Sequence, residues 1–225
     1  MKTRIIYLII IVLNLTLAQF AQSQIKQGTV MLGSTVSFHS SRSNGPYDFT
    51  NKNVFYSIDP SLGRVVRQNL ILGIDLLYSN RRIDEIINGI INYTKVNTFG
   101  LGATASPYQN LGKSGIYLFL YNRLGFDYSR TKNTRLTGGY DLNGNTFTFG
   151  LGVSPGVSYA VNKKFHVEAG LSQLFWIGYS NSQFKYDGPD QLVSKSSKFN
   201  ANIGLGNSIL WSVGFKFFFP PSLKS

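Results

Sequence analysis

The sequence has no cysteine, only two histidines and few charged residues. Of its 225 residues, 14% are charged, against roughly 25% in an ordinary soluble domain. The absence of cysteine excludes a disulfide scaffold, a thiol nucleophile, an iron–sulfur site and a lipid-modified N-terminal cysteine. Two histidines also argue against a zinc enzyme. Beyond the N-terminus, no apolar run is long enough to cross a bilayer as a helix.

An export signal is predicted at the N-terminus. Lys2 and Arg4 precede an apolar run over 5–13, and the small residues Ala21 and Ser23 precede a cleavage site at Gln24. This is the layout of a secretory signal peptide. The run is too short for a spanning helix, which needs about 20 residues. We therefore predict a signal peptide over 1–23, one domain over 24–219 and a short tail over 220–225.

Apolar residues alternate with small or polar residues through most of the remaining chain. Phe147, Phe149 and Leu151, for example, alternate with Thr148 and Gly150. A period of two predicts β-strands with one apolar face. We expect eight strands, at about 28–39, 54–66, 69–79, 97–108, 115–129, 146–161, 164–180 and 199–219.

The connections between these strands alternate in length. Tight turns are expected at 67–68, 109–114 and 162–163, and long polar loops at 40–53, 80–96, 130–145 and 181–198. Short turns at one end and long loops at the other are typical of outer-membrane barrels. The predicted fold is all-β: an eight-stranded antiparallel up-and-down transmembrane β-barrel with short periplasmic turns and long extracellular loops.

The distribution of charge indicates that lipid, rather than water, faces the apolar side. Seven of the eight charged residues in the predicted strands share the face of small residues, and the exception, Arg64, lies at a turn end. A soluble barrel would need a charged outer face, whereas a lipid-facing charge at mid-depth costs about 2–4 kcal/mol. The apolar face is therefore predicted to point outward.

Aromatic residues gather at the predicted strand ends, as expected for the girdles at two membrane interfaces. One rim would hold Phe38, Tyr78, Tyr128 and Tyr179, and the other Tyr108, Tyr159, Phe165, Phe217 and Phe219.

The lumen is predicted to be packed rather than open. Strand 115–129 directs Tyr117, Phe119 and Tyr121 inward, beside strands that present glycines such as Gly100 and Gly150. An eight-stranded barrel is just wide enough for side chains.

Charged side chains inside such a lumen must be paired. We expect Glu168 to meet Lys216 near the periplasmic rim, and Asp75 to meet Arg123 across the lumen. These pairs are predicted as structural salt bridges, with an ion path as the alternative.

Four segments resemble a known family. They are residues 27–33 (QGTVMLG), 59–63 (DPSLG) and 152–159 (GVSPGVSY), and the phenylalanine-rich last strand. With these segments the chain resembles small outer-membrane β-barrel proteins of Bacteroidota, of the OmpX/OmpW-like type. The resemblance implies a membrane barrel and folding by the outer-membrane insertion machinery, which recognises a last strand ending in phenylalanine, here Phe219. It points to no single activity.

Two histidine motifs are candidate sites. His39-Ser40-Ser41 has the spacing seen in barrel enzymes that deacylate lipid A, but no acidic residue follows within six positions to orient the histidine. His166 and Glu168 share an inward face, but a metal would need a third ligand. No catalytic residue, metal site or cofactor is predicted.

Segment 81–93 has a different periodicity. Isoleucines recur at helical spacing, and Asp84 and Glu85 precede most of them. We expect a short amphipathic helix packed on the barrel mouth, or alternatively a membrane-surface or partner-binding element. Its apolar face would consist of Ile83, Ile86, Ile87, Ile90 and Ile91.

The net charge of +12 concentrates in the predicted outer loops, which favours contact with outer-membrane lipid and lipopolysaccharide phosphates over nucleic acid. The predicted protein is non-enzymatic, with a structural or surface-interaction role and a possible envelope protein partner. A narrow porin-like channel and a lipid A deacylase-like enzyme are the alternatives.

Overall fold

The computed structural model describes residues 25–45, 49–87, 90–112, 114–135, 141–172, 174–187, 192–203 and 211–220. These residues form one antiparallel sheet of ten strands. The strands are β1 (Val30–Gly45), β2 (Phe49–Arg67), β3 (Leu70–Ile87), β4 (Ile90–Asn110), β5 (Ile116–Arg135), β6 (Leu142–Asn162), β7 (Phe165–Leu171), β8 (Phe175–Tyr186), β9 (Val193–Ile203) and β10 (Trp211–Phe219). No helix in the described ranges is long and apolar enough to cross a membrane.

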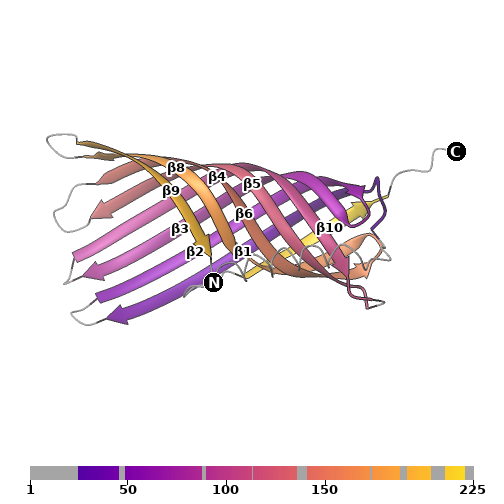
Figure 1. The fold of residues 1–225 in the computed structure, drawn as a ribbon. Coiled ribbons are helices and arrows are strands. Elements are labelled where there is room, and N and C mark those ends of the chain that lie inside the picture. The colour runs from indigo at the N-terminus through magenta and orange to yellow at the C-terminus, as the bar shows by residue number, and fades with distance from the viewer. Residues whose placement is uncertain are drawn as a thin grey trace, which may run out of the picture.

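The sheet closes into a barrel (Figure 1). Each of β1 to β6 pairs with its neighbour in sequence, β1 pairs with β10, β10 with β7, and β7 with β6. At the end that carries the short turns, eight strands therefore complete a ring, which confirms the predicted fold class. The predicted signal peptide over 1–23 lies outside the described residues, as does all of the predicted tail except its first residue.

The last two predicted strands are each divided into two segments. β7 pairs with β6 from Gly156 onward, and β8 pairs with β6 up to Val153. The two ladders are interrupted at Ser154 and Pro155, which lie between Val153 and Gly156 of β6. Since proline has no N–H to donate, a ladder is readily interrupted beside it. β9 pairs with β8, and β10 pairs with β7 nearer the short turns.

The predicted long loops are largely wrong, because the strands continue through them (Figure 1, left end of the barrel). β2 to β6 contain 18 to 21 residues each, about twice the 9–11 residues that a tilted strand needs to cross a bilayer. The extensions carry polar residues on both faces, which gives them a loop-like sequence, but antiparallel hairpin pairing and their threonines, tyrosines and isoleucines favour strand.

The predicted amphipathic helix over 81–93 is also wrong. Its residues form the end of the β3–β4 hairpin, in which Ile86 lies opposite Ile91 and Ile87 opposite Ile90, while Ile83 lies opposite Thr94. β-Branched isoleucine is stiff at χ1 and suits a strand better than a helix. The isoleucines that are spaced like one face of a helix are instead brought together by cross-strand pairing in a hairpin.

The outer surface of the barrel is a broad apolar belt. Leu76, Phe126 and Val213 expose 57%, 65% and 60% of their surface. Contiguous apolar patches on soluble monomers rarely exceed a few hundred Å², whereas this belt surrounds the barrel. Outward residues between the row Tyr78–Phe99–Tyr128–Phe147 and the short turns are uncharged in the described strands apart from Arg64 and Arg67 at the turn end of β2.

The hairpin geometry of 81–93 can be tested with cysteines, since the chain has none of its own. Ile86→Cys/Ile91→Cys should form a disulfide under mild oxidation, because the two residues are cross-strand partners within the Cα range that a disulfide bridges. The control Arg82→Cys/Ile86→Cys should stay reduced, since four residues along a strand span about 13 Å. A disulfide in the control pair and none in the Ile86→Cys/Ile91→Cys pair, seen on a non-reducing gel, would contradict the hairpin and support the predicted helix.

Candidate functional site in the barrel lumen

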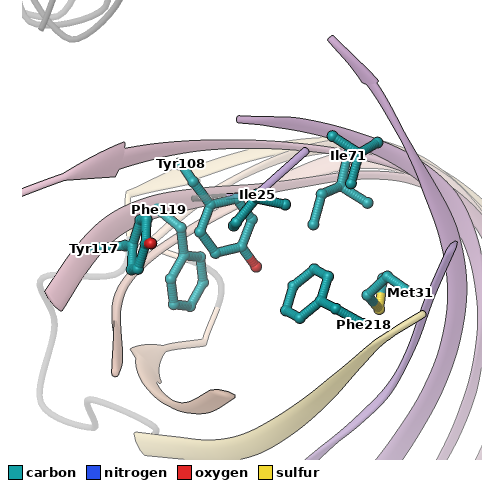
Figure 2. Packing of buried hydrophobic residues seen from close by; sticks show 8 residues of the cluster. Ile25, Met31, Ile71, Tyr108, Tyr117, Phe119 and Phe218 are labelled. Carbon is teal, nitrogen blue, oxygen red and sulfur yellow. The ribbon is translucent and has the colours of Figure 1, made fainter. Parts of the chain in front are cut away.

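Buried aromatic and aliphatic side chains fill the lumen at the short-turn end. Figure 2 shows this group inside the ring of strands. We call it the plug, and it consists of Ile25, Met31, Val65, Ile71, Tyr108, Tyr117, Phe119 and Phe218. The Tyr108 ring stacks on Phe119 with centroids 5.5 Å apart. These residues come from β1–β5, β10 and the segment before β1, so the plug ties most of the wall together.

A buried ion pair lies against the plug. The Lys216 ammonium lies 3.0 Å from a carboxylate oxygen of Glu168, and the Tyr108 hydroxyl donates to the other oxygen at 2.7 Å. Lys216 also donates to the Tyr108 hydroxyl and lies 5.4 Å from the Phe119 ring centroid. The ammonium is thus held by a carboxylate, a phenol and aromatic faces, as a desolvated cation requires.

A second charged cluster lies in the lumen, farther from the short turns. The Arg123 Nε donates to Asp75 at 2.9 Å, and its two terminal nitrogens donate to Asp127 at 2.8 and 3.2 Å. The Tyr121 hydroxyl donates to Asp75 as well. One guanidinium therefore bridges two carboxylates in a bidentate arrangement. Both ion pairs expected from the sequence, Glu168–Lys216 and Asp75–Arg123, are present.

Glycines on the neighbouring strands make room for these side chains. A Cβ atom at Gly102 would lie 2.6 Å from an Asp75 carboxylate oxygen and 2.7 Å from the Arg123 Nε. At Gly156 a Cβ atom would lie 2.4 Å from the ring of Phe119. Bulky lumen residues and small neighbours are therefore matched in position, as the sequence pattern predicted.

The prediction that Tyr108 belongs to the aromatic girdle is wrong. The sequence pattern placed it at the short-turn rim facing lipid, but only 4% of its surface is exposed and its hydroxyl joins the Glu168–Lys216 pair. Counting by twos from Gly100, Gly102 and Thr104 places Tyr108 on the inward register, so the alternation itself contained this information. Tyr121 and Asp127 are two further members of the charge network that the predicted pairs did not include.

The other predicted girdle residues lie on the wall with their side chains exposed or partly exposed. At the long-hairpin end these are Phe38, Tyr78, Tyr128 and Tyr179, and at the short-turn end Tyr159, Phe165, Phe217 and Phe219. Tyr78, Tyr128 and their cross-strand partners Phe99 and Phe147 form one aromatic row.

A cavity of about 290 Å³ lies in the lumen above the plug. Its walls are rich in hydroxyl groups, including those of Ser37, Ser57 and Ser79, and Trp176 lines one side. Asp59, Asp75, Asp127 and Arg123 also line it. This volume is at the lower end of the range for small-molecule sites.

Neither histidine has the surroundings of a catalytic or metal site within the described residues. His166 is buried, with its Nδ1 3.2 Å from the Ser158 hydroxyl and its ring near those of Tyr117 and Phe218. No carboxylate contacts His39 in the described part of the chain. No group of three or more potential ligands in these ranges is placed to hold a metal ion.

No protein-family model matches this sequence, and no curated protein does so either. Among solved structures, the outer membrane protein OprG from Pseudomonas aeruginosa aligns with a TM-score of 0.50 and 14% identity, covering 89% of this chain and 100% of that one. A major outer membrane protein from Thermus thermophilus aligns with a TM-score of 0.46 and 10% identity, covering 86% of this chain and 100% of that one. Neisserial surface protein A aligns with a TM-score of 0.39 and 18% identity, covering 85% of this chain and 97% of that one.

The similarity to OprG shows a shared fold. Together with the closed ring and the apolar belt, it defines the chain as a transmembrane β-barrel of the outer-membrane type.

The Glu168–Lys216 pair gives a stability prediction. Lys216→Met leaves a buried carboxylate without its cation and should lower the free energy of unfolding by about 3–5 kcal/mol. Urea unfolding of the protein in lipid vesicles, followed by tryptophan fluorescence, would measure this.

The double variant Glu168→Gln/Lys216→Met is the matched control. It removes both charges while keeping an acceptor for the Tyr108 hydroxyl, so it should recover a large part of the lost stability. A double variant as unstable as Lys216→Met would contradict the pairing account.

Proposed function

We propose that this chain is exported to the outer membrane of a Gram-negative bacterium and forms a non-enzymatic barrel there with a closed lumen. Its role is structural, or it interacts with the cell surroundings through its long hairpins. The export signal over 1–23 and the similarity to Bacteroidota barrels of the OmpX/OmpW-like type belong to this proposal. Assembly by the outer-membrane insertion machinery also belongs to it, since β10 ends at Phe219, which pairs with Val30 on β1.

The observation that carries the proposal is the paired, packed lumen. A pore that passes solutes needs a hydrated path, but Tyr117 is fully buried and the neighbouring Tyr108, Phe119 and Phe218 are nearly so. The charges beside them are engaged with each other rather than arranged along a channel. An eight-stranded ring leaves no room beside such a filling.

The long hairpins support an interaction role. They extend about 8–10 residues beyond the length that spans a bilayer, and they carry exposed side chains on a rigid paired backbone. Rigid scaffolds that present variable ends commonly carry binding functions. Lipopolysaccharide and an envelope protein are the partners we propose for them.

A narrow channel for ions or small solutes is the second candidate. The cavity of about 290 Å³ above the plug favours it, because its hydroxyl-lined walls suit a hydrated solute. In that case the plug would have to open.

Conductance in planar bilayers separates the two candidates. The unmodified protein should show no steady open-channel current. Tyr117→Ala/Phe119→Ala, which truncates two plug residues of β5, should give frequent current steps, because the cavity then connects to the short-turn end.

The control variant is Leu118→Ala/Leu120→Ala on the same strand. These residues alternate with Tyr117 and Phe119 and so point to the other side of the wall. The control should conduct no more than the unmodified protein. A steady current from the unmodified barrel would overturn the closed lumen and favour the channel.

A further inference from the structure

Basic side chains form a row across the outward face of the long hairpins. Cross-strand register places Arg82 opposite Lys95, Lys95 opposite Lys132, Lys132 opposite Asn143, and Asn143 opposite Lys185. The row thus runs over β3, β4, β5, β6 and β8. Its basic members are all exposed or partly exposed.

The three lysines of the row are not neutralised by nearby acids. Arg82 pairs with Asp84 at 3.0 Å, and Asn143 donates to Asp187 at 3.2 Å. In the described part of the chain, Lys95, Lys132 and Lys185 have no carboxylate within 4.0 Å. Like charges directly opposite each other destabilise a sheet, so Lys95 and Lys132 in register indicate that an external anion compensates them.

An apolar cleft lies below this row on the same wall. It has a volume of about 490 Å³ and is lined mainly by Phe99, Leu101, Phe126, Phe147, Phe149 and Tyr179. The Phe126 and Phe149 rings lie 4.6 Å apart between centroids. The residues belong to the apolar belt, where acyl chains are the natural contact.

Polar groups occupy the level between the cleft and the basic row. Register places Asn97 opposite Arg130, Arg130 opposite Asn145, and Asn145 opposite Gln183. A second cleft at this level is lined by Tyr128, Asn145, Phe147, Asn181 and Gln183. Side-chain amides both donate and accept hydrogen bonds, so this level suits a head group rich in hydroxyls.

The three levels occur in the order of the parts of an anionic lipid. The basic row lies four residues above the aromatic row Tyr78–Phe99–Tyr128–Phe147, which is about 13 Å along the strands and about 9 Å in height at a tilt of about 45°. A polar head layer adds about 5–8 Å to each side of the hydrocarbon core. Arg130, two residues above the aromatic row, therefore stands within the layer of lipid phosphates, and Lys95 and Lys132 stand at its outer edge.

We propose that the wall formed by β4, β5, β6 and β8 is a binding site for a phosphorylated glycolipid of the outer leaflet. The acyl chains lie in the aromatic cleft, the sugar hydroxyls meet the amide level, and the phosphates are held by Arg130 and the basic row. This inference rests on the proposed membrane location and adds a defined site and ligand chemistry to it.

Lipid retention by the full mature chain tests the site. The protein is first inserted into phosphatidylcholine nanodiscs, and folding is checked by its heat-modifiable mobility on a gel. Diphosphoryl lipid A, phosphatidylglycerol or inorganic phosphate is then added, and binding is measured by native mass spectrometry. We expect tighter binding of lipid A than of phosphatidylglycerol, and no retention of inorganic phosphate.

Two matched variants locate the site. Arg130→Gln/Lys132→Gln should weaken lipid A binding on the order of 30-fold, since each basic group near a charged membrane surface contributes about fivefold. Arg42→Gln/Lys52→Gln removes two basic groups that face each other on β1 and β2, away from the cleft. This control should bind lipid A like the unmodified protein.

A third variant, Phe126→Ala/Phe147→Ala, should weaken lipid A binding while leaving folding intact. Equal losses in the two charge variants, equal binding of lipid A and phosphatidylglycerol, or full affinity in the aromatic variant would each overturn the site. Failure to insert into phosphatidylcholine nanodiscs would instead contradict the proposed membrane location, so the two failures are distinguishable.

Discussion

Backbone hydrogen bonding in hydrocarbon is the constraint on which this structure depends. No water is available inside a bilayer to satisfy an unpaired N–H or C=O group, so a sheet that crosses it must close on itself. Here closure is made by the ladder from Val30 opposite Phe219 to Ser37 opposite Ser212, and by the ladder between β7 and β10. The remaining features follow from turning the apolar face of this ring toward lipid.

The orientation of the apolar face determines what fills the lumen. With the apolar side chains outward, the polar and charged residues of each strand face one another in a narrow interior. Arg123 pairs with two carboxylates, Lys216 pairs with one, and the hydroxyls of Tyr108 and Tyr121 donate to the carboxylates as well. A cavity remains above the plug, where many of the lining residues are serine and threonine. The same strands thus supply a packed base and a polar upper chamber.

Sequence alternation was sufficient to predict the barrel, the direction of its faces and two lumen ion pairs, because a period of two depends on each residue and its immediate neighbours. It failed where the answer depends on which residues of different strands pair with each other. The isoleucines of 81–93 fit a helix by spacing, and only the pairing of Ile86 with Ile91 makes them a hairpin. The division of the seventh strand depends on Pro155 in a different strand. The position of Tyr108 was the exception, since correct counting from Gly102 would have placed it inside.

The most direct test of the central claim asks which tryptophan lipid can reach. Trp211 lies on β10 with 64% of its surface exposed on the outer wall, whereas Trp176 lines the lumen cavity. In vesicles whose acyl chains carry bromine, the fluorescence of Trp176→Phe, which retains Trp211, should be strongly quenched, and that of Trp211→Phe should change little. Strong quenching of Trp176 together with an unquenched Trp211 would mean that the barrel faces are reversed.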